Sequence, residues 1–148
     1  MGTRSVIKFQ EDGETICAIY QQFDGYIEGV GVTLHDFLKD FTIVNGLSDG
    51  QPERVANGMG CLAAQFIAEH KNGSGGFYMT HPDDNQEYNY LVNYNWEDEG
   101  EGWLMKPGPL QITVTSDYLD DPNPLFQGSV DEFGEFIDTY DDEEDEVA

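Results

Sequence analysis

The sequence predicts a single α+β domain: an antiparallel sheet with two helices, in the approximate order ββααββββ, followed by an acidic C-terminal segment. Short runs rich in Val, Ile, Tyr, Phe and Thr are separated by turns that contain Gly, Asp and Pro, as is typical of antiparallel strands. Two stretches between these runs have apolar residues three or four positions apart, which indicates helices. With 148 residues, 39% of them hydrophobic, the chain is long enough for one domain with its own core.

The N-terminal elements are expected to be a hairpin and a short helix. Residues 5–10 and 16–22 are β-prone runs, and the Asp12-Gly13 pair between them suits a tight reversal. Residues 33–36 read Thr-Leu-His-Asp, a capping box in which Asp replaces the usual Glu. Apolar residues follow at helical spacing up to Phe41, so we expect a helix that begins at Thr33.

Residues 57–60, Asn-Gly-Met-Gly, are expected to open a longer helix over residues 61–71. Four strands should follow, at residues 77–80, 87–96, 103–105 and 110–115, broken by turn-forming clusters. These elements complete a body that spans residues 1–115.

Beyond that body the composition changes. Residues 116–140 combine acids with spaced aromatic residues and are compatible with a short acidic helix, because Ser129-Val130-Asp131-Glu132 is a second capping box. Gly134 weakens such a helix. Residues 141–148 are an acidic run that we expect to be disordered.

Acidic side chains dominate the sequence. The chain has 30 Asp and Glu residues against 6 Lys and Arg, a net charge of −24 at pH 7, and residues 111–148 hold 13 of the acids and no base. Nucleic acids and anionic membranes are bound through clustered Lys and Arg, so direct binding to either is disfavoured. No stretch approaches the ~20 apolar residues of a membrane span, and the first residues lack the apolar run of a signal peptide. We therefore expect a cytoplasmic protein.

The acidic segment contains the partner-binding residues that the sequence favours. Aromatic residues are interleaved with its carboxylates, whereas a tail that serves only solubility needs no spaced apolar stripe. Such a surface suits a partner whose own site binds nucleic acid. The candidate residues are Asp117, Asp120, Asp121, Asp131, Glu132, Phe133, Glu135, Phe136, Asp138 and Tyr140. A solvated tail is the alternative interpretation.

A second candidate site is the glycine-rich entry to the longer helix. Free backbone amides at a helix N-terminus attract phosphate, although the glycine spacing here matches neither the dinucleotide fingerprint nor the P-loop. The candidate ligand-binding residues are Arg4, Gln22, Tyr26, Asn57, Gly58 and Gly60. A tight entry turn would explain the same glycines.

Catalytic and metal-binding motifs are not visible in the sequence. Cys17 or Cys61 could form a nucleophilic pair with His35, His70 or His81, but no local motif supports their adjacency. The spacing of the acids does not match a calcium-binding EF-hand loop. We predict no metal, no cofactor and no enzymatic activity.

Four short segments together resemble a group of small uncharacterised proteins from phages and prokaryotic genomes. These segments are residues 1–5 (Met-Gly-Thr-Arg-Ser), 22–26, 41–46 and 55–60, and the resemblance covers roughly residues 1–96. It implies a phage or phage-derived context, in which small acidic proteins often inhibit host nucleic-acid-binding proteins.

The function that we predict is that of an interaction protein. It would present carboxylates in place of phosphates to a basic nucleic-acid-binding surface on a host protein, and would thereby inhibit that protein. A small-ligand or nucleotide-sequestering protein that uses the residue 57–60 helix entry is the alternative.

Overall fold

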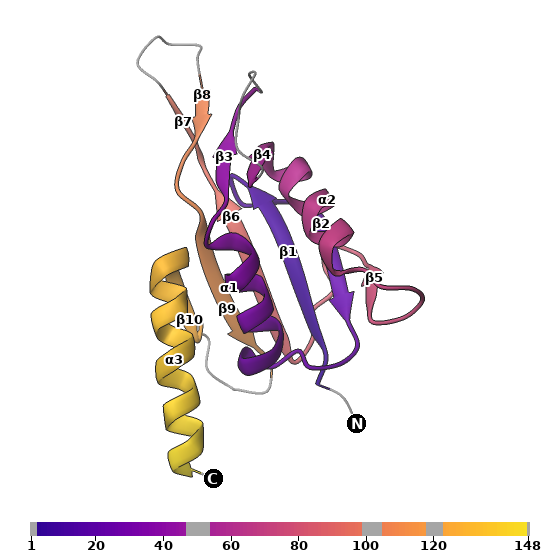
Figure 1. Cartoon of the computed structure of the whole chain (residues 1–148), viewed down its shortest axis with the longest axis vertical. Helices are drawn as coiled ribbons and strands as arrows, with labels where there is room; N and C mark the ends of the chain where they lie inside the picture. The colour runs from indigo at the N-terminus through magenta and orange to yellow at the C-terminus, as the bar shows by residue number, and fades with distance from the viewer. Residues whose placement is uncertain (1–2, 47–53, 99–104, 118–122, 148) are drawn as a thin grey trace.

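The computed structural model describes residues 3–46, 54–98, 105–117 and 123–147, with the backbone alone for residues 141–147. Its centre is a six-stranded sheet in the order β10-β9-β6-β1-β2-β5, with helices packed on one face (Figure 1). The strands of this sheet are β1 (Ser5–Glu11), β2 (Glu14–Gln21), β5 (Phe77–Met79), β6 (Tyr88–Tyr94), β9 (Gln111–Ser116) and β10 (Phe126–Ser129). The predicted combination of helices with a mostly antiparallel sheet is confirmed, although β1 and β6 run parallel.

Two smaller sheets lie at one end of the central one (Figure 1). The first pairs β3 (Thr42–Val44) with β4 (Val55–Asn57), and the second is a hairpin of β7 (Trp96–Asp98) and β8 (Met105–Pro107). The side-chain amide of Asn45 joins them by donating to the carbonyl oxygen of Met105, at 3.0 Å. The strand predicted over residues 103–105 falls partly on residues outside the described ranges, and β8 begins where that part ends.

The predicted N-terminal hairpin is present, with β1 and β2 paired from Ser5 opposite Gln21 to Glu11 opposite Glu14. Asp12 and Gly13 form the turn with φ angles of 51° and 80°. Positive φ at both central positions is the geometry that matches the twist of the two strands. The Asp-Gly pair therefore predicted this element correctly.

The first helix begins earlier than Thr33. A π-helical turn, η1 (Ile27–Gly31), leads directly into α1 (Val32–Leu38), and Gly31 already has helical angles of −57° and −47°. Thr33 is therefore inside the helix, and the capping box predicted there is wrong. Val30, Leu34, Phe37 and Leu38 face the core from these two elements.

The second helix, α2 (Gly58–His70), covers the sheet beside α1 (Figure 1). Met59, Leu62 and Phe66 are its buried contacts, and the Phe66 ring lies 5.6 Å from the Phe9 ring of β1. Its opposite side is open to solvent, so the helix packs on one face.

The structure has a third α-helix, α3 (Val130–Val147), where the sequence predicted two helices and a separate acidic segment. The strand β10 before it pairs with β9 and extends the central sheet. Phe133 and Ile137 of α3 belong to the same core as β1, β6 and α1. Residues 126–137 are therefore part of the folded body. The helix continues through residues 141–147, which the sequence predicted to be disordered.

Candidate functional site

The most distinctive surface is the solvent side of α3, and a capping box fixes where this helix begins. The Ser129 amide donates to the Glu132 carboxylate at 2.9 Å, and the Glu132 amide donates to the Ser129 hydroxyl at 3.1 Å. The hydrogen bond from the Ser129 amide lowers the pKa of Glu132. The second capping box predicted from the sequence is thus confirmed, and it orients the helix that follows.

Burial divides α3 into an apolar side and an acidic side. Phe133 and Ile137 are 0% and 6% exposed, whereas the four carboxylate-bearing residues Asp131, Glu132, Glu135 and Asp138 are exposed. This division follows from the helical period, because residues three or four apart share a face. Phe133 is thus a core residue and is not available as the partner-binding anchor that the sequence suggested.

Two of the predicted aromatic residues remain partly exposed on α3. The Phe136 ring lies 5.0 Å from the Phe126 ring of β10 and is tilted 31° to it, and the Tyr140 ring lies 5.6 Å from the Phe136 ring. Their rings form a short aromatic row beside the carboxylates. Aromatic residues are enriched in protein interfaces, and a partner-binding role for Phe136 and Tyr140, which also pack against the core, stays a prediction.

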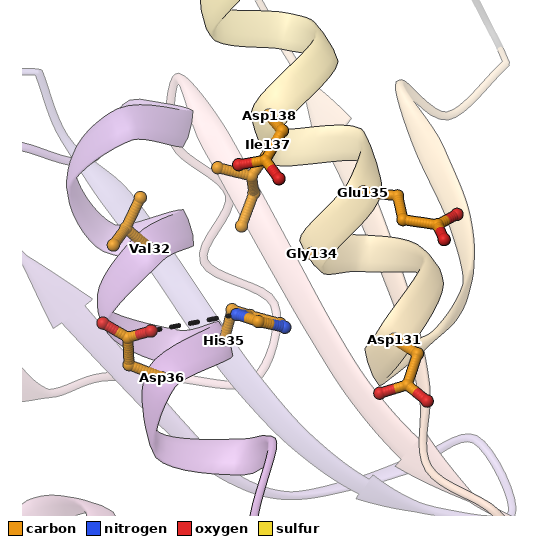
Figure 2. Close-up of a pocket in the computed structure, with 8 residues that line it drawn as sticks. All are labelled: Val32, His35, Asp36, Asp131, Gly134, Glu135, Ile137 and Asp138. Atoms are coloured by element: carbon orange, nitrogen blue, oxygen red, sulfur yellow. Dashed lines mark ion pairs between the residues drawn. The ribbon is translucent and has the colours of Figure 1, made fainter.

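A groove of about 460 Å³ separates α3 from α1. Figure 2 shows His35 of α1 pointing toward Gly134 of α3, with carboxylates on both sides of it. The His35 ring also lies 3.9 Å from Asp36 and 6.3 Å from the Phe133 ring. The residues lining the groove are Val32, His35, Asp36, Asp131, Gly134, Glu135, Ile137 and Asp138.

Several of the six basic residues are engaged within the chain and do not oppose the acidic surface. Arg54 lies over the Phe41 ring at 4.5 Å and pairs with Glu69 at 3.6 Å. Lys71 donates to two backbone carbonyls, and Lys39 lies 3.6 Å from Asp36. Lys8 is 7% exposed and donates to Asn85. No cluster of bases forms around α3 in the part of the chain that the structure describes.

The remaining predicted partner-binding residues are not next to this surface in any contact that the structure describes. Asp117 is exposed at the end of β9, where its amide donates to the Glu87 carbonyl. Asp120 and Asp121 lie outside the described residues. The candidate surface therefore consists of Asp131, Glu132, Glu135, Asp138, Phe136 and Tyr140, which we call the α3 acidic face.

The alternative site at the start of α2 is occupied by groups of the protein itself. The Met59 amide donates to the Tyr94 hydroxyl at 3.1 Å and to the Glu11 carboxylate at 3.2 Å. Tyr94 donates to the same carboxylate at 2.8 Å, and burial together with this carboxylate raises the pKa of Tyr94. Glu11 therefore stands where a phosphate would have to bind.

Asn57 and Gly60 lie at the start of α2 itself, where the Asn57 side-chain oxygen accepts from the Gly46 amide at 2.7 Å, whereas the other three residues proposed for that pocket have partners elsewhere. Arg4 pairs with Glu87 at 3.7 Å, Gln22 accepts a hydrogen bond from Tyr20, and Tyr26 is exposed beside Asp24. Gly58 has a φ of +84°, so this glycine forms a tight entry turn, as the sequence allowed. No local pattern in the sequence indicates the role of Glu11, since Glu11 reaches Met59 and Tyr94 only through the fold.

The hydrogen bonds and ion pairs described for the histidines and cysteines do not join a cysteine to a histidine. His70 bonds the Phe66 carbonyl, His81 bonds the Asp83 amide, and His35 faces carboxylates. Burial raises the pKa of Cys17, which is the opposite of nucleophile activation. Within the described ranges no three His, Cys, Asp or Glu side chains are placed to hold a metal ion.

No helix in the described part of the chain is long and apolar enough to cross a membrane. Comparisons of the chain with protein-family models, with curated proteins and with solved structures found no match.

Proposed function

We propose that the chain is a non-enzymatic interaction protein that occupies a basic nucleic-acid-binding surface on another protein. Its α3 acidic face would present carboxylates where that surface otherwise holds phosphates. The partner's Lys and Arg side chains would then supply the attraction, and the bound chain would exclude the nucleic acid.

The charge density along α3 supports this proposal. Ten of its 18 residues are acidic, and a helix of this length extends about 27 Å at 1.5 Å per residue. Its mean spacing is therefore one charge per ~2.7 Å, between the ~1.7 Å of duplex DNA and the ~3.4 Å of one strand. Figure 1 shows α3 along the edge of the molecule, with its C-terminal end extending past the strands. A basic surface would therefore reach α3 from its exposed side, since α1 and β10 cover the other side.

A phage or phage-derived setting for this activity is part of the proposal, as implied by the resemblance of residues 1–96 to small uncharacterised proteins from phages and prokaryotic genomes. We propose that the partner is a host protein and that the complex forms in the host cytoplasm. Inhibition would follow from competition, because one basic groove cannot hold both the helix and nucleic acid.

The proposal is tested by capture from a host lysate followed by competition with DNA or RNA. A captured protein supports it only if it binds nucleic acid and if this chain displaces that nucleic acid. The affinity should fall steeply between about 0.1 M and about 1 M salt, because exposed charges are screened over ~10 Å and ~3 Å respectively. An affinity that is independent of salt contradicts the proposal.

A set of neutralised variants shows whether α3 carries the interaction. Asp131→Asn, Glu135→Gln and Asp138→Asn, combined in one chain, remove three charges from the α3 acidic face with little change of shape. The matched control combines Glu14→Gln, Asp40→Asn and Asp83→Asn, three exposed positions on other elements. We expect the first variant to weaken binding at least ~10-fold more than the control. Equal losses would show that only net charge matters.

A further inference from the structure

The sheet face opposite the helices is unusual in this chain because it carries no acidic residue in its central rows. Three rows of residues, each paired with its partner on the neighbouring strand, cross this face. One row runs from Thr115 of β9 to Tyr78 of β5, one from Gln127 of β10 to Ala18 of β2, and one from Ser129 of β10 to Thr15 of β2. Four of these 15 positions, Val6, Lys8, Ala18 and Asn89, are buried. About one residue in five of the chain is acidic, so about two of the other 11 positions would be expected to be Asp or Glu. None of them is.

This face has a covered part and a more open part. The segment between β5 and β6 lies over β1, where Lys8 donates to Asn85 at 2.9 Å and Asn89 accepts from the Gln86 amide at 2.8 Å. On β6, β9 and β10 the same face is more open: Leu91 and Thr113 are half-buried, and Gln111 and Gln127 are exposed. We call this second part the neutral sheet face.

We propose that the neutral sheet face is the interface with a second copy of this chain. Contact between two chains of charge −24 is excluded wherever it would bury facing carboxylates, because like charges in an interface cost several kcal/mol. Depletion of charged residues is also the compositional mark of interface cores. A two-fold arrangement would place the same face of each copy against the other and leave both α3 acidic faces free.

The proposed dimer has a salt dependence opposite to that of the partner complex. The neutral face removes repulsion at the contact, but the net charges of the two chains still repel at longer range. Screening reduces that repulsion, so the dimer should become stronger from about 0.1 M to about 1 M salt. The complex with a basic partner should become weaker over the same range, so the two proposals can fail independently.

Sedimentation equilibrium of the full chain, from about 1 µM to about 1 mM at both salt concentrations, tests this interface. Gln111→Glu combined with Gln127→Glu keeps the side-chain shapes and places carboxylates on the face. The matched control, Asn72→Asp with Ser74→Asp, adds the same charge in the exposed segment before β5, at the other edge of the sheet from β10. We expect the face variant to weaken the dimer at least ~10-fold more than the control.

Three results would overturn the proposal. They are a wild-type chain that stays monomeric throughout, a dimer that the face variant leaves unchanged, and equal weakening by the face variant and the control. Circular dichroism of both variants shows whether each retains the fold.

Discussion

His35 lies against the backbone of α3 at Gly134, so closely that a Cβ atom on Gly134 would be 2.5 Å from the imidazole Nε2. Glycine in a helix interior costs about 1 kcal/mol relative to alanine, and this contact accounts for its presence. The missing side chain allows α3 to approach α1 and to bury Phe133 and Ile137. The close approach of the two helices beside the groove therefore depends on Gly134, a residue that the sequence alone predicts to weaken the helix.

We expect Gly134→Ala to lower the free energy of unfolding by up to about 2 kcal/mol, because overpacking against the His35 ring exceeds the gain in helix propensity. In a His35→Ala background the same change should instead raise stability by roughly 1 kcal/mol. Urea unfolding of the two single variants and the double variant measures this reversal of sign. A stabilising Gly134→Ala in the wild-type chain would contradict the contact.

The Ser129–Glu132 capping box makes a second prediction, on stability and pH. Ser129→Ala should cost about 1 kcal/mol, the usual value for loss of a helix cap. The folded state lowers the pKa of Glu132, so its contribution is present above the unfolded value near 4.5 and is lost as the pH falls through the lower folded value. Urea unfolding from pH 7 to pH 3 should show a smaller acid loss for Glu132→Gln than for the wild type. Identical pH profiles would exclude the capping interaction.

The network around Glu11 makes a third prediction. Tyr94→Phe removes the hydroxyl that accepts from Met59 and donates to the Glu11 carboxylate. Loss of a hydrogen bond to a charged group should cost about 1.5–3 kcal/mol, although the Met59 amide keeps Glu11 as its acceptor. Tyr26→Phe is the matched control, because that hydroxyl is exposed, and it should change stability by less than about 0.5 kcal/mol. Urea unfolding compares the two variants.

The same network predicts that nucleotides do not bind at the start of α2. Wild-type melting temperatures measured with a panel of nucleotides should not rise, since Glu11 already accepts from the Met59 amide. Gly58→Val should lower stability, because a β-branched residue is strained at a φ of +84°. A nucleotide that raises the melting temperature of the wild type would contradict this prediction and support the nucleotide-binding alternative.

Local signals predicted the local elements of this fold. The Asp12-Gly13 pair located the first hairpin and the Ser129-to-Glu132 motif located the start of α3, because both act within four residues. Thr33 failed as a cap because the preceding turn was already helical, and that turn is held in part by the hydrogen bond from the Val30 amide to the Asp24 carbonyl, six residues earlier. The capping pattern alone does not distinguish the start of a helix from its interior.

The features of the site that the sequence did not predict depend on contacts between residues that are far apart in the chain. The sequence identifies the acidic residues of α3. That these residues are exposed while Phe133 is buried depends on α1 and β10, which cover one side of the helix. The sequence places Phe126 in an acidic segment, whereas in the structure its strand extends the sheet through pairing with β9. Likewise, Glu11 and Tyr94 are 83 residues apart, and no local pattern links them.

The last prediction concerns where the chain can be shortened. From the sequence, truncation after Thr115 should leave a folded body, but this cut removes β10 together with the buried Phe133 and Ile137. Loss of one buried Phe side chain costs about 3–5 kcal/mol, a large part of the stability of a domain. We expect the protein truncated after Thr115 to be unfolded. Truncation after Tyr140, in contrast, keeps the buried residues of α3 and removes six acidic residues. Reduced self-repulsion should then raise the melting temperature at low salt. Near-ultraviolet circular dichroism and thermal melts of both truncations test this, and a cooperatively folded protein ending at Thr115 would show that α3 is dispensable for the core.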